Sequence, residues 1–153
     1  MHRIARLVAA ALALIVMVAA CADDGPPPSP SGDHPSTLDG SSWTVVAING
    51  QATPRGAQPT MEFAAATVQG TGPCNHFGGS YRYDPASGEL RFDNLGMTAM
   101  ACAEPARNQV ETTFMQAVGQ PLLVVTLEPN GRLVILGSAG SRLELISGLT
   151  IID

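Results

Sequence analysis

The sequence predicts an α+β domain in which a small antiparallel sheet, strongly curled or closed into a partial β-barrel, packs against one helix. About seven to eight short segments rich in β-branched and aromatic residues are separated by turns of Gly, Pro, Asn and Asp. A single later segment has the apolar spacing of a helix. Strands do not alternate with helices and no repeat period is present, which argues against a parallel sheet or a solenoid.

The first half of the domain contributes five of the expected strands. They are 43–48, 60–63, 67–70, 80–83 and 89–92. The segment 51–59, which contains two prolines, is expected to be a loop. Apolar and polar residues alternate in 60–63 and in the last two strands, as in strands buried on one face. Residues 84–88, which read Asp-Pro-Ala-Ser-Gly, join the last two strands as a hairpin.

Pro105 and Glu104 mark the start of the predicted helix. A proline at the first helical position leaves no N–H unpaired, and a carboxylate is favourable at the positive end of the helix. Every fourth residue from 110 to 118 is apolar, which gives the helix one buried face. Gly119 and Pro121 predict its end. Three more strands are expected at 122–127, 133–136 and 142–146, before an apolar tail of unassigned role at 148–153.

Composition favours a packed, acidic domain that does not bind nucleic acid. The 153 residues are 45% hydrophobic and 14% charged, a balance typical of a folded core. The formal net charge is −5. Residues 1–20 hold two Arg and no acid, so the remainder has six Arg against 13 acidic residues, a net charge near −7. Such a surface offers no basic patch for phosphates.

The first 21 residues have the pattern of an export signal. Arg3 and Arg6 precede 14 uninterrupted apolar residues, 7–20. This run is short for a membrane-spanning helix, which needs about 20 residues, and fits the core of a cleaved signal peptide. Small residues lead directly to Cys21, which resembles the lipobox of bacterial lipoproteins. The resemblance implies a diacylglycerol on Cys21 and cleavage before it; the alternative is an ordinary signal peptide followed by a chance cysteine.

A flexible tether is expected after the signal. Pro, Gly, Ser and Asp dominate 21–37, and this composition buries too little apolar surface to fold. His34 within it is expected to be solvated. The predicted organisation is a signal peptide at 1–20, a lipidated Cys and disordered tether at 21–37, and one domain at 38–153.

Two unusual segments carry a family resemblance. Residues 70–81 read Gly-x-x-x-Cys-Asn-x-Phe-x-Gly-x-Tyr, residues 98–102 read Thr-x-Met-x-Cys, and a Glu follows on the predicted helix. With an early Trp, the motif residues are Trp43, Gly70, Cys74, Asn75, Phe77, Gly79, Tyr81, Thr98, Met100, Cys102 and Glu111. The pattern resembles the META (HslJ-like) domain over about 38–146, with Pro73 standing where the family usually has Gly. The resemblance implies a small β-rich fold in heat-shock or envelope-stress proteins, often lipoproteins, with no established enzymatic chemistry.

Cys74 and Cys102 are the two cysteines left in the domain. An even pair in an exported protein predicts a disulfide. Two free buried thiols are an alternative, as is a redox-active pair, although no Cys-x-x-Cys motif is present to lower a thiol pKa. A metal site that includes His76 lacks a fourth ligand. Cys74 as a nucleophile with His76 as its base lacks an orienting acid.

Most other candidates are interpreted as structural. Asn75 suits a turn, and Gly78 and Gly79 suit a turn or close packing, with an anion-binding backbone nest as the alternative. Glu111 is expected to be solvated or to accept backbone N–H groups. The aromatic residues are expected in the core rather than on a sugar-stacking platform, and three methionines are expected to fill gaps in that core. These residues are Trp43, Phe77, Tyr81, Tyr83, Phe92, Met97, Met100 and Met115.

The sequence therefore predicts a non-enzymatic lipoprotein, anchored in the cell membrane on the extracytoplasmic side, that is a stress-related binding or structural module. Its expected partners are the membrane, through the lipid on Cys21, and an unidentified protein or envelope component. No catalytic residue, metal, cofactor or nucleic acid is predicted. Two alternatives stay open: an exported inhibitor of a secreted hydrolase that inserts loop 51–59 or 71–79, and a thiol- or metal-dependent protein that uses Cys74, His76 and Cys102.

Overall fold

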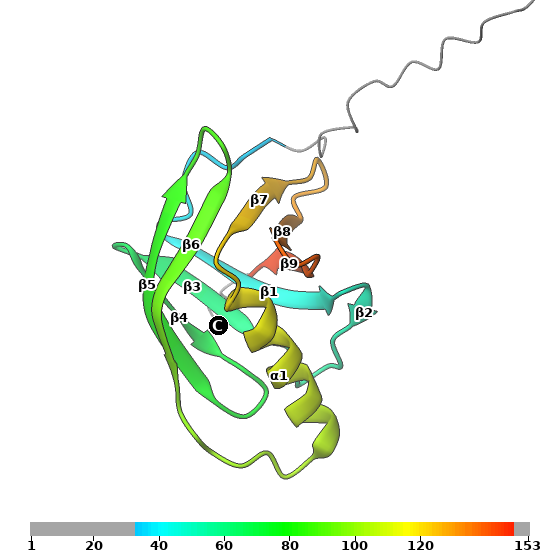
Figure 1. Ribbon diagram of the computed structural model, residues 1–153. Coiled ribbons are helices and arrows are strands. Elements are labelled where there is room, and N and C mark those ends of the chain that lie inside the picture. The colour runs from blue at the N-terminus through cyan, green and yellow to red at the C-terminus, as the bar shows by residue number, and fades with distance from the viewer. Residues whose placement is uncertain (1–32, 149–153) are drawn as a thin grey trace, which may run out of the picture.

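A closed barrel of eight antiparallel strands with one helix forms the described part of the chain, which confirms the predicted fold class (Figure 1). The computed structural model describes residues 33–148. The predicted signal peptide, Cys21, most of the predicted tether and the tail 149–153 lie outside the described residues. The barrel strands are β1 (Ser41–Ile48), β3 (Thr60–Ala64), β4 (Thr67–Thr71), β5 (His76–Asp84), β6 (Glu89–Met97), β7 (Leu123–Leu127), β8 (Leu133–Gly137) and β9 (Arg142–Ser147).

Pairing of the first and last strands closes the barrel. β1 pairs with β9 from Trp43↔Ser147 to Ile48↔Leu143 and with β3 on its other edge. A register shift on β1 between Val45 and Ala47 marks a bulge, which bends a strand and helps a sheet to curl. The short strand β2 (Gln51–Ala52) folds back on β1 at the start of the predicted loop 51–59. Because both edges of the sheet are paired, the barrel is closed rather than partial.

The helix α1 (Pro105–Val118) begins and ends where the sequence predicts. Pro105 is in its first turn, and the Gly119 N–H donates to the Met115 carbonyl at its end (2.9 Å). Only two residue pairs join β6 to β7, and α1 packs against the barrel near this seam (Figure 1). Phe114 and Val118, on the predicted apolar face, are buried against the barrel core.

Inward-facing side chains fill the barrel. Phe63 meets Tyr81 edge to face with ring centroids 5.0 Å apart, and Phe77 meets Phe114 of the helix at 5.3 Å. The aromatic residues expected in the core are all found there, either buried or half-buried against it. Phe77 and Tyr81 are buried, and Trp43, Tyr83 and Phe92 are half-buried.

Strands β5 and β6 are longer than the alternating segments predicted. The predicted strands 80–83 and 89–92 are the cores of a hairpin that reaches back to His76 and on to Met97. The glycine-rich segment before Ser80 belongs to β5, where a bulge lies between Gly78 and Ser80. A Cβ at Gly79 would lie 2.8 Å from the Asp93 carbonyl oxygen. Of the two roles expected for these glycines, a turn or close packing, the structure shows close packing between strands.

Two of the three methionines assigned to the core are on the surface. Met97 is 45% exposed and Met100 is 55% exposed, so their prediction as gap-filling core residues is wrong. Met115 is half-buried against the core, as expected. Met97 lies at the last position of β6 and Met100 on the connection to α1, where the strand pattern used for the prediction no longer applies.

Residues before the predicted domain start at 38 contact the barrel. The Leu127 N–H donates to the Asp33 carbonyl (2.8 Å), and Tyr83 Oη donates to the Pro35 carbonyl (2.7 Å). His34 is half-buried and its Nδ1 donates to the Val125 carbonyl (2.8 Å), so the prediction of a solvated His34 is wrong. The end of the segment predicted as tether therefore contacts the barrel. Among residues 33–148, no helix is long and apolar enough to span a membrane.

Candidate functional site

The motif residues meet around the side chain of Asn75, in the turn between β4 and β5. Asn75 is 4% exposed, and its Oδ1 accepts hydrogen bonds from Thr98 Oγ1 (2.8 Å) and the Met100 N–H (2.7 Å). Its Nδ2 donates to the Met100 carbonyl (3.1 Å) and to Glu111 Oε1 (2.6 Å). Both donors and both acceptor positions of the amide are therefore used. Asn75 joins the turn, the β6–α1 connection and α1.

Glu111 supplies the negative charge of this cluster. It is 4% exposed, and its Oε2 accepts hydrogen bonds from the N–H groups of Cys74 (3.0 Å) and Asn75 (2.8 Å). A Cβ at Gly72 would lie 2.5 Å from the same oxygen, so only glycine fits beside the carboxylate. Of the two roles expected for Glu111, the structure shows the acceptor of backbone N–H groups. The amides that could form an anion-binding nest in this turn bind an internal anion instead.

A disulfide covers the same turn. Cys74 and Cys102 are bonded, with Cα atoms 5.5 Å apart and a separation of 28 positions in the chain, as the paired cysteines predict. On the other side of the turn, Arg107 donates to the carbonyl of Pro73 (3.3 Å). Pro73 lacks an N–H, but the two amides that follow it still reach Glu111. The Pro at this position is therefore compatible with the hydrogen bonds of the turn.

The donor set of the cluster does not fit a metal ion. Atoms of Cys74, Cys102 and Glu111 lie within 4.8 Å of one another. The two sulfurs are bonded to each other, and the carboxylate already accepts three N–H donors. His76 is exposed on β5 and takes part in the cluster only through its backbone, which bonds to Thr98. The oxidised structure therefore brings Cys74, Cys102 and Glu111 together and leaves the His76 ring outside.

Gly70 and Tyr81 serve the packing below the turn. A Cβ at Gly70 would collide with the Thr60 carbonyl and lie 2.8 Å from the ring of Phe77. Tyr81 is buried at 8% exposure, and burial, followed by the nearby Asp39 carboxylate, raises the pKa of its phenol above 10.0. Every buried side-chain nitrogen and oxygen among residues 33–148 has a hydrogen-bond partner. The buried polar groups of the motif are therefore all hydrogen-bonded, and the motif residues form a structural cluster.

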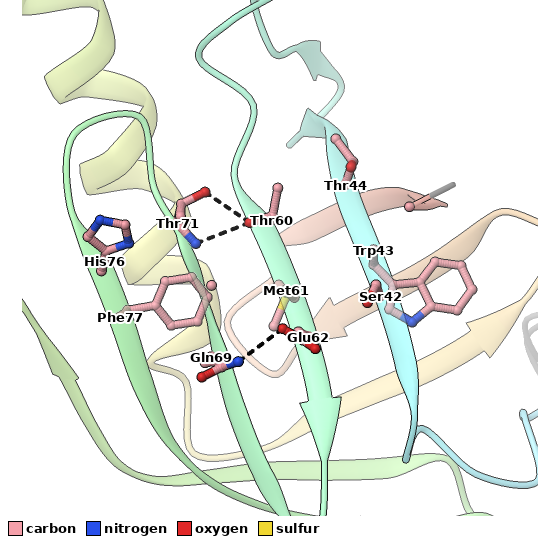
Figure 2. Close-up of a pocket in the computed structure, with 12 residues that line it drawn as sticks. Ser42, Trp43, Thr44, Thr60, Met61, Glu62, Gln69, Thr71, His76 and Phe77 are labelled. Atoms are coloured by element: carbon pink, nitrogen blue, oxygen red, sulfur yellow. Dashed lines mark hydrogen bonds between the residues drawn. The ribbon is translucent and has the colours of Figure 1, made fainter. Parts of the chain in front are cut away.

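A groove of 470 Å³ lies on the outer face of β1, β3, β4 and β5, and is called the outer groove below (Figure 2). Two transverse rows of polar side chains line it. The first row is Thr44, Thr60, Thr71 and His76, and the second is Ser42, Glu62 and Gln69. The Thr60 and Thr71 hydroxyls bond to each other (2.9 Å), and Gln69 Nε2 donates to Glu62 Oε2 (3.0 Å). Trp43 of β1 borders the outer groove and is drawn with it in Figure 2, but its half-buried side chain packs against the barrel core.

A second concavity, of 730 Å³, separates the β6–α1 connection from α1. Its apolar lining comes from Met97, Met100 and Met115, and Asn75 and Glu111 lie at its base. The residues around the methionines are uncharged Ala, Thr, Asn and Gln. The two exposed methionines therefore border a concave surface rather than project singly into solvent.

Sequence reasoning did not identify the outer groove. Among its polar residues only His76 had been singled out, as a metal or base candidate. Hydroxyl side chains at alternate strand positions are also what an ordinary solvated strand face shows. The distinguishing signal is that the polar positions of four strands fall in register, and this depends on pairings that the sequence does not specify.

Comparisons with known proteins agree with this architecture. A search of curated proteins finds no match to the chain. A protein from Burkholderia xenovorans, solved by NMR, is similar at 24% identity and a TM-score of 0.63, over 83% of this chain and 97% of that one. Another NMR structure is similar at 24% identity and a TM-score of 0.58, over 71% of this chain and 90% of that one. A crystal structure of a DUF4847 family protein from Bacteroides vulgatus is similar at 12% identity and a TM-score of 0.50, over 71% of this chain and 93% of that one.

These likenesses to solved structures show the fold. The family follows from a separate comparison, in which the model of the META domain matches residues 36–148. The match starts two residues before the predicted boundary at 38, within the segment that contacts the barrel, and ends with the last described residue. It includes the Asn75 cluster and the outer groove. The chain belongs to the META domain family.

Proposed function

We propose that this protein is an exported lipoprotein, anchored through Cys21, whose META domain is a non-enzymatic binding or structural module of the cell envelope. The observation that carries the proposal is the use of the motif in internal contacts. The thiols of Cys74 and Cys102 form a disulfide, and the carboxylate of Glu111 accepts backbone and amide N–H groups. The two thiols and the carboxylate are therefore engaged in holding the fold, and the ring of His76, the candidate base, lies outside the cluster.

Export is supported by the same disulfide and by the leader. Disulfides persist in oxidising compartments and are rare in the cytosol. The residues before Cys21 have the charge, length and small residues of a lipoprotein signal. Acyl chains on Cys21, two or more of them, would hold the domain at a membrane with the acidic barrel outside the cytoplasm.

Intact mass of the full-length gene product, extracted from membranes, tests the anchor. We expect a mature chain that starts at Cys21 and carries diacylglycerol, with Cys74 and Cys102 resistant to alkylation until a reductant is added. The variant Cys21→Ala is expected in the soluble fraction with its leader uncleaved or miscleaved. A wild-type chain that keeps its leader or lacks lipid would contradict the anchor.

The stress-related role rests on the family resemblance, and transcript abundance after heat shock tests it directly. A rise of several-fold is expected, and an unchanged transcript would remove this part of the proposal. Within the described residues 33–148, no contact favours the hydrolase-inhibitor alternative. In the loops it would use, Thr53 Oγ1 donates to the Val45 carbonyl (2.7 Å) and the 72–75 turn is fixed by Glu111.

A further inference from the structure

We propose that the outer groove is a binding site for a neutral oligosaccharide. This inference rests on the proposed function as a binding module and names the class of ligand. The groove is open to solvent along its length, and its volume of 470 Å³ is within the range of small-ligand sites, about 300–1,000 Å³. Both the available hydrogen-bonding groups and the charge of its lining favour this class.

The lining is built to pair with hydroxyl groups. Its polar side chains are hydroxyls, a carboxamide, a carboxylate and an imidazole. Ser42 Oγ, Thr44 Oγ1 and the His76 ring have no hydrogen-bond partner among residues 33–148, and Gln69 Oε1 is equally free there. Hydroxyl and amide groups both donate and accept, as sugar hydroxyls do. The rows are fixed by strand pairing, so these groups are positioned before a ligand binds.

Charge excludes the main competing ligands. Every basic residue of the chain is Arg apart from three His, and none of the arginines of residues 33–148 lines the outer groove. Glu62 places one carboxylate there. Phosphates, nucleic acids and acidic polysaccharides would meet a negative group with no arginine to offset it. A purely apolar ligand would desolvate the hydroxyl rows without replacing their hydrogen bonds to water.

Trp43 lies at the edge of the outer groove but does not present its ring there. Its partner on β3 is Met61, which is 1% exposed, and the half-buried Trp43 side chain packs against the barrel core, with Nε1 donating to Ser41 Oγ (2.8 Å). The polar rows therefore make the contacts to the ligand, and binding is best measured by a method that does not depend on Trp43.

The test is isothermal titration calorimetry on the full-length gene product in a zwitterionic detergent, because sugar-headed detergents would compete. The probes are the neutral tetrasaccharides chitotetraose and maltotetraose, with an anionic galacturonic acid tetramer as comparator. We expect saturable binding of at least one neutral probe with a Kd between about 10 μM and 1 mM, typical of few-contact sites. Gln69→Ala and Thr44→Val should each weaken it about fivefold, the effect of one lost hydrogen bond.

Gln116→Ala is the matched control, because Gln116 lines the methionine-bordered concavity instead of the outer groove. Binding by this variant should equal that of the wild type. The proposal is overturned if neither neutral probe gives a saturable change up to about 10 mM, well above the expected Kd. It is also overturned if the anionic tetramer binds more tightly, or if both groove variants bind like the wild type. Because lipidation is scored by mass, loss of the anchor and loss of sugar binding are distinguishable.

Discussion

At the scale of single residues, the molecule depends on one buried carboxylate. Glu111 sits on the helix and accepts N–H groups from a turn 36 and 37 positions earlier in the chain. Burying a charge is unfavourable unless it is fully hydrogen-bonded, and here three donors satisfy it. The side chain thus fastens α1 to the barrel through a polar contact with a defined geometry.

Glu111→Gln should destabilise the domain by about 2–3 kcal/mol, because the amide NH₂ of Gln must face an N–H donor that then loses its acceptor. Urea unfolding monitored by circular dichroism measures the effect. Glu104→Gln is the control, since the Glu104 carboxylate is 68% exposed and pairs only with Arg107. Its change should stay below about 0.5 kcal/mol. Equal stability of Glu111→Gln and wild type would mean that the carboxylate does not fasten the turn.

The sequence motif identifies the residues of this cluster, but it does not predict which of them contact one another. Asn75 and Glu111 were selected from the sequence, but nothing local tells that one side chain bonds the other across the fold. Met97 and Met100 show a second limit of sequence analysis, because they are predicted to be buried and are exposed. An apolar residue predicts burial only while the strand pattern around it holds, and that pattern ends at the β6–α1 connection.

At the scale of elements, the disulfide joins the β4–β5 turn to the connection before α1. Replacing both cysteines, Cys74→Ala with Cys102→Ala, should lower the free energy of unfolding by about 3–4 kcal/mol, the loop entropy expected for 28 residues. The fold should persist, because β4 and β5 pair over five positions without it. Urea unfolding of the variant and of the reduced wild type should agree. If reduction leaves stability unchanged, the bridge does not restrain the unfolded chain.

Exposure of the β6–α1 connection predicts a difference in methionine oxidation. Dilute peroxide should convert Met97 and Met100 to sulfoxides well before Met61, because attack requires access and Met61 is 1% exposed. Peptide mass spectrometry over time gives the three rates. Met61 is the internal control, since it has the same thioether in the same folded chain. Similar rates at the three positions would show that the connection is as protected as the core.

At the scale of the whole molecule, closure of the sheet is what the sequence could not indicate. Turn signals and alternation predict the individual strands and a curled sheet, and they do so nearly in full. The pairing of β1 with β9 joins segments about a hundred positions apart in the chain. No local pattern specifies which two edges meet, and the outer groove exists only once β1, β3, β4 and β5 are in register.

Charged residues near the closing strands make stability depend on pH. Arg132 and Arg142 both hydrogen-bond to Glu144 on β9, and these bonds hold the pKa of its carboxyl below 4.5. Hydrogen bonds from Ala86 and Ser87 likewise keep the pKa of Asp84 below 3.8. A depressed carboxyl pKa contributes stability above the unfolded value, and that contribution is lost as the pH falls through the folded pKa. The domain should therefore weaken progressively below pH 4.5.

At alkaline pH the dependence of stability on pH has the opposite sign. Burial raises the phenol pKa of Tyr81 and of Tyr83 above 10.0, so their contribution is complete below pH 10.0 and is lost as the pH rises through the raised values. The thermal unfolding temperature, measured from acid to alkaline pH, should therefore show a plateau between the two ranges in which stability is lost.

Glu144→Gln tests the predicted loss of stability at acid pH. Because both arginines are partly exposed, the variant should lose only about 1 kcal/mol at neutral pH, and the loss should shrink in acid as the pH falls through the lowered pKa of the wild-type carboxyl. Glu89→Gln, which removes an exposed pair with Arg91, should change stability little at either pH. A loss for Glu144→Gln that is equally large in acid would trace the effect to packing of the side chain rather than to its charge. The loss of stability in acid would then have to come from other carboxyls.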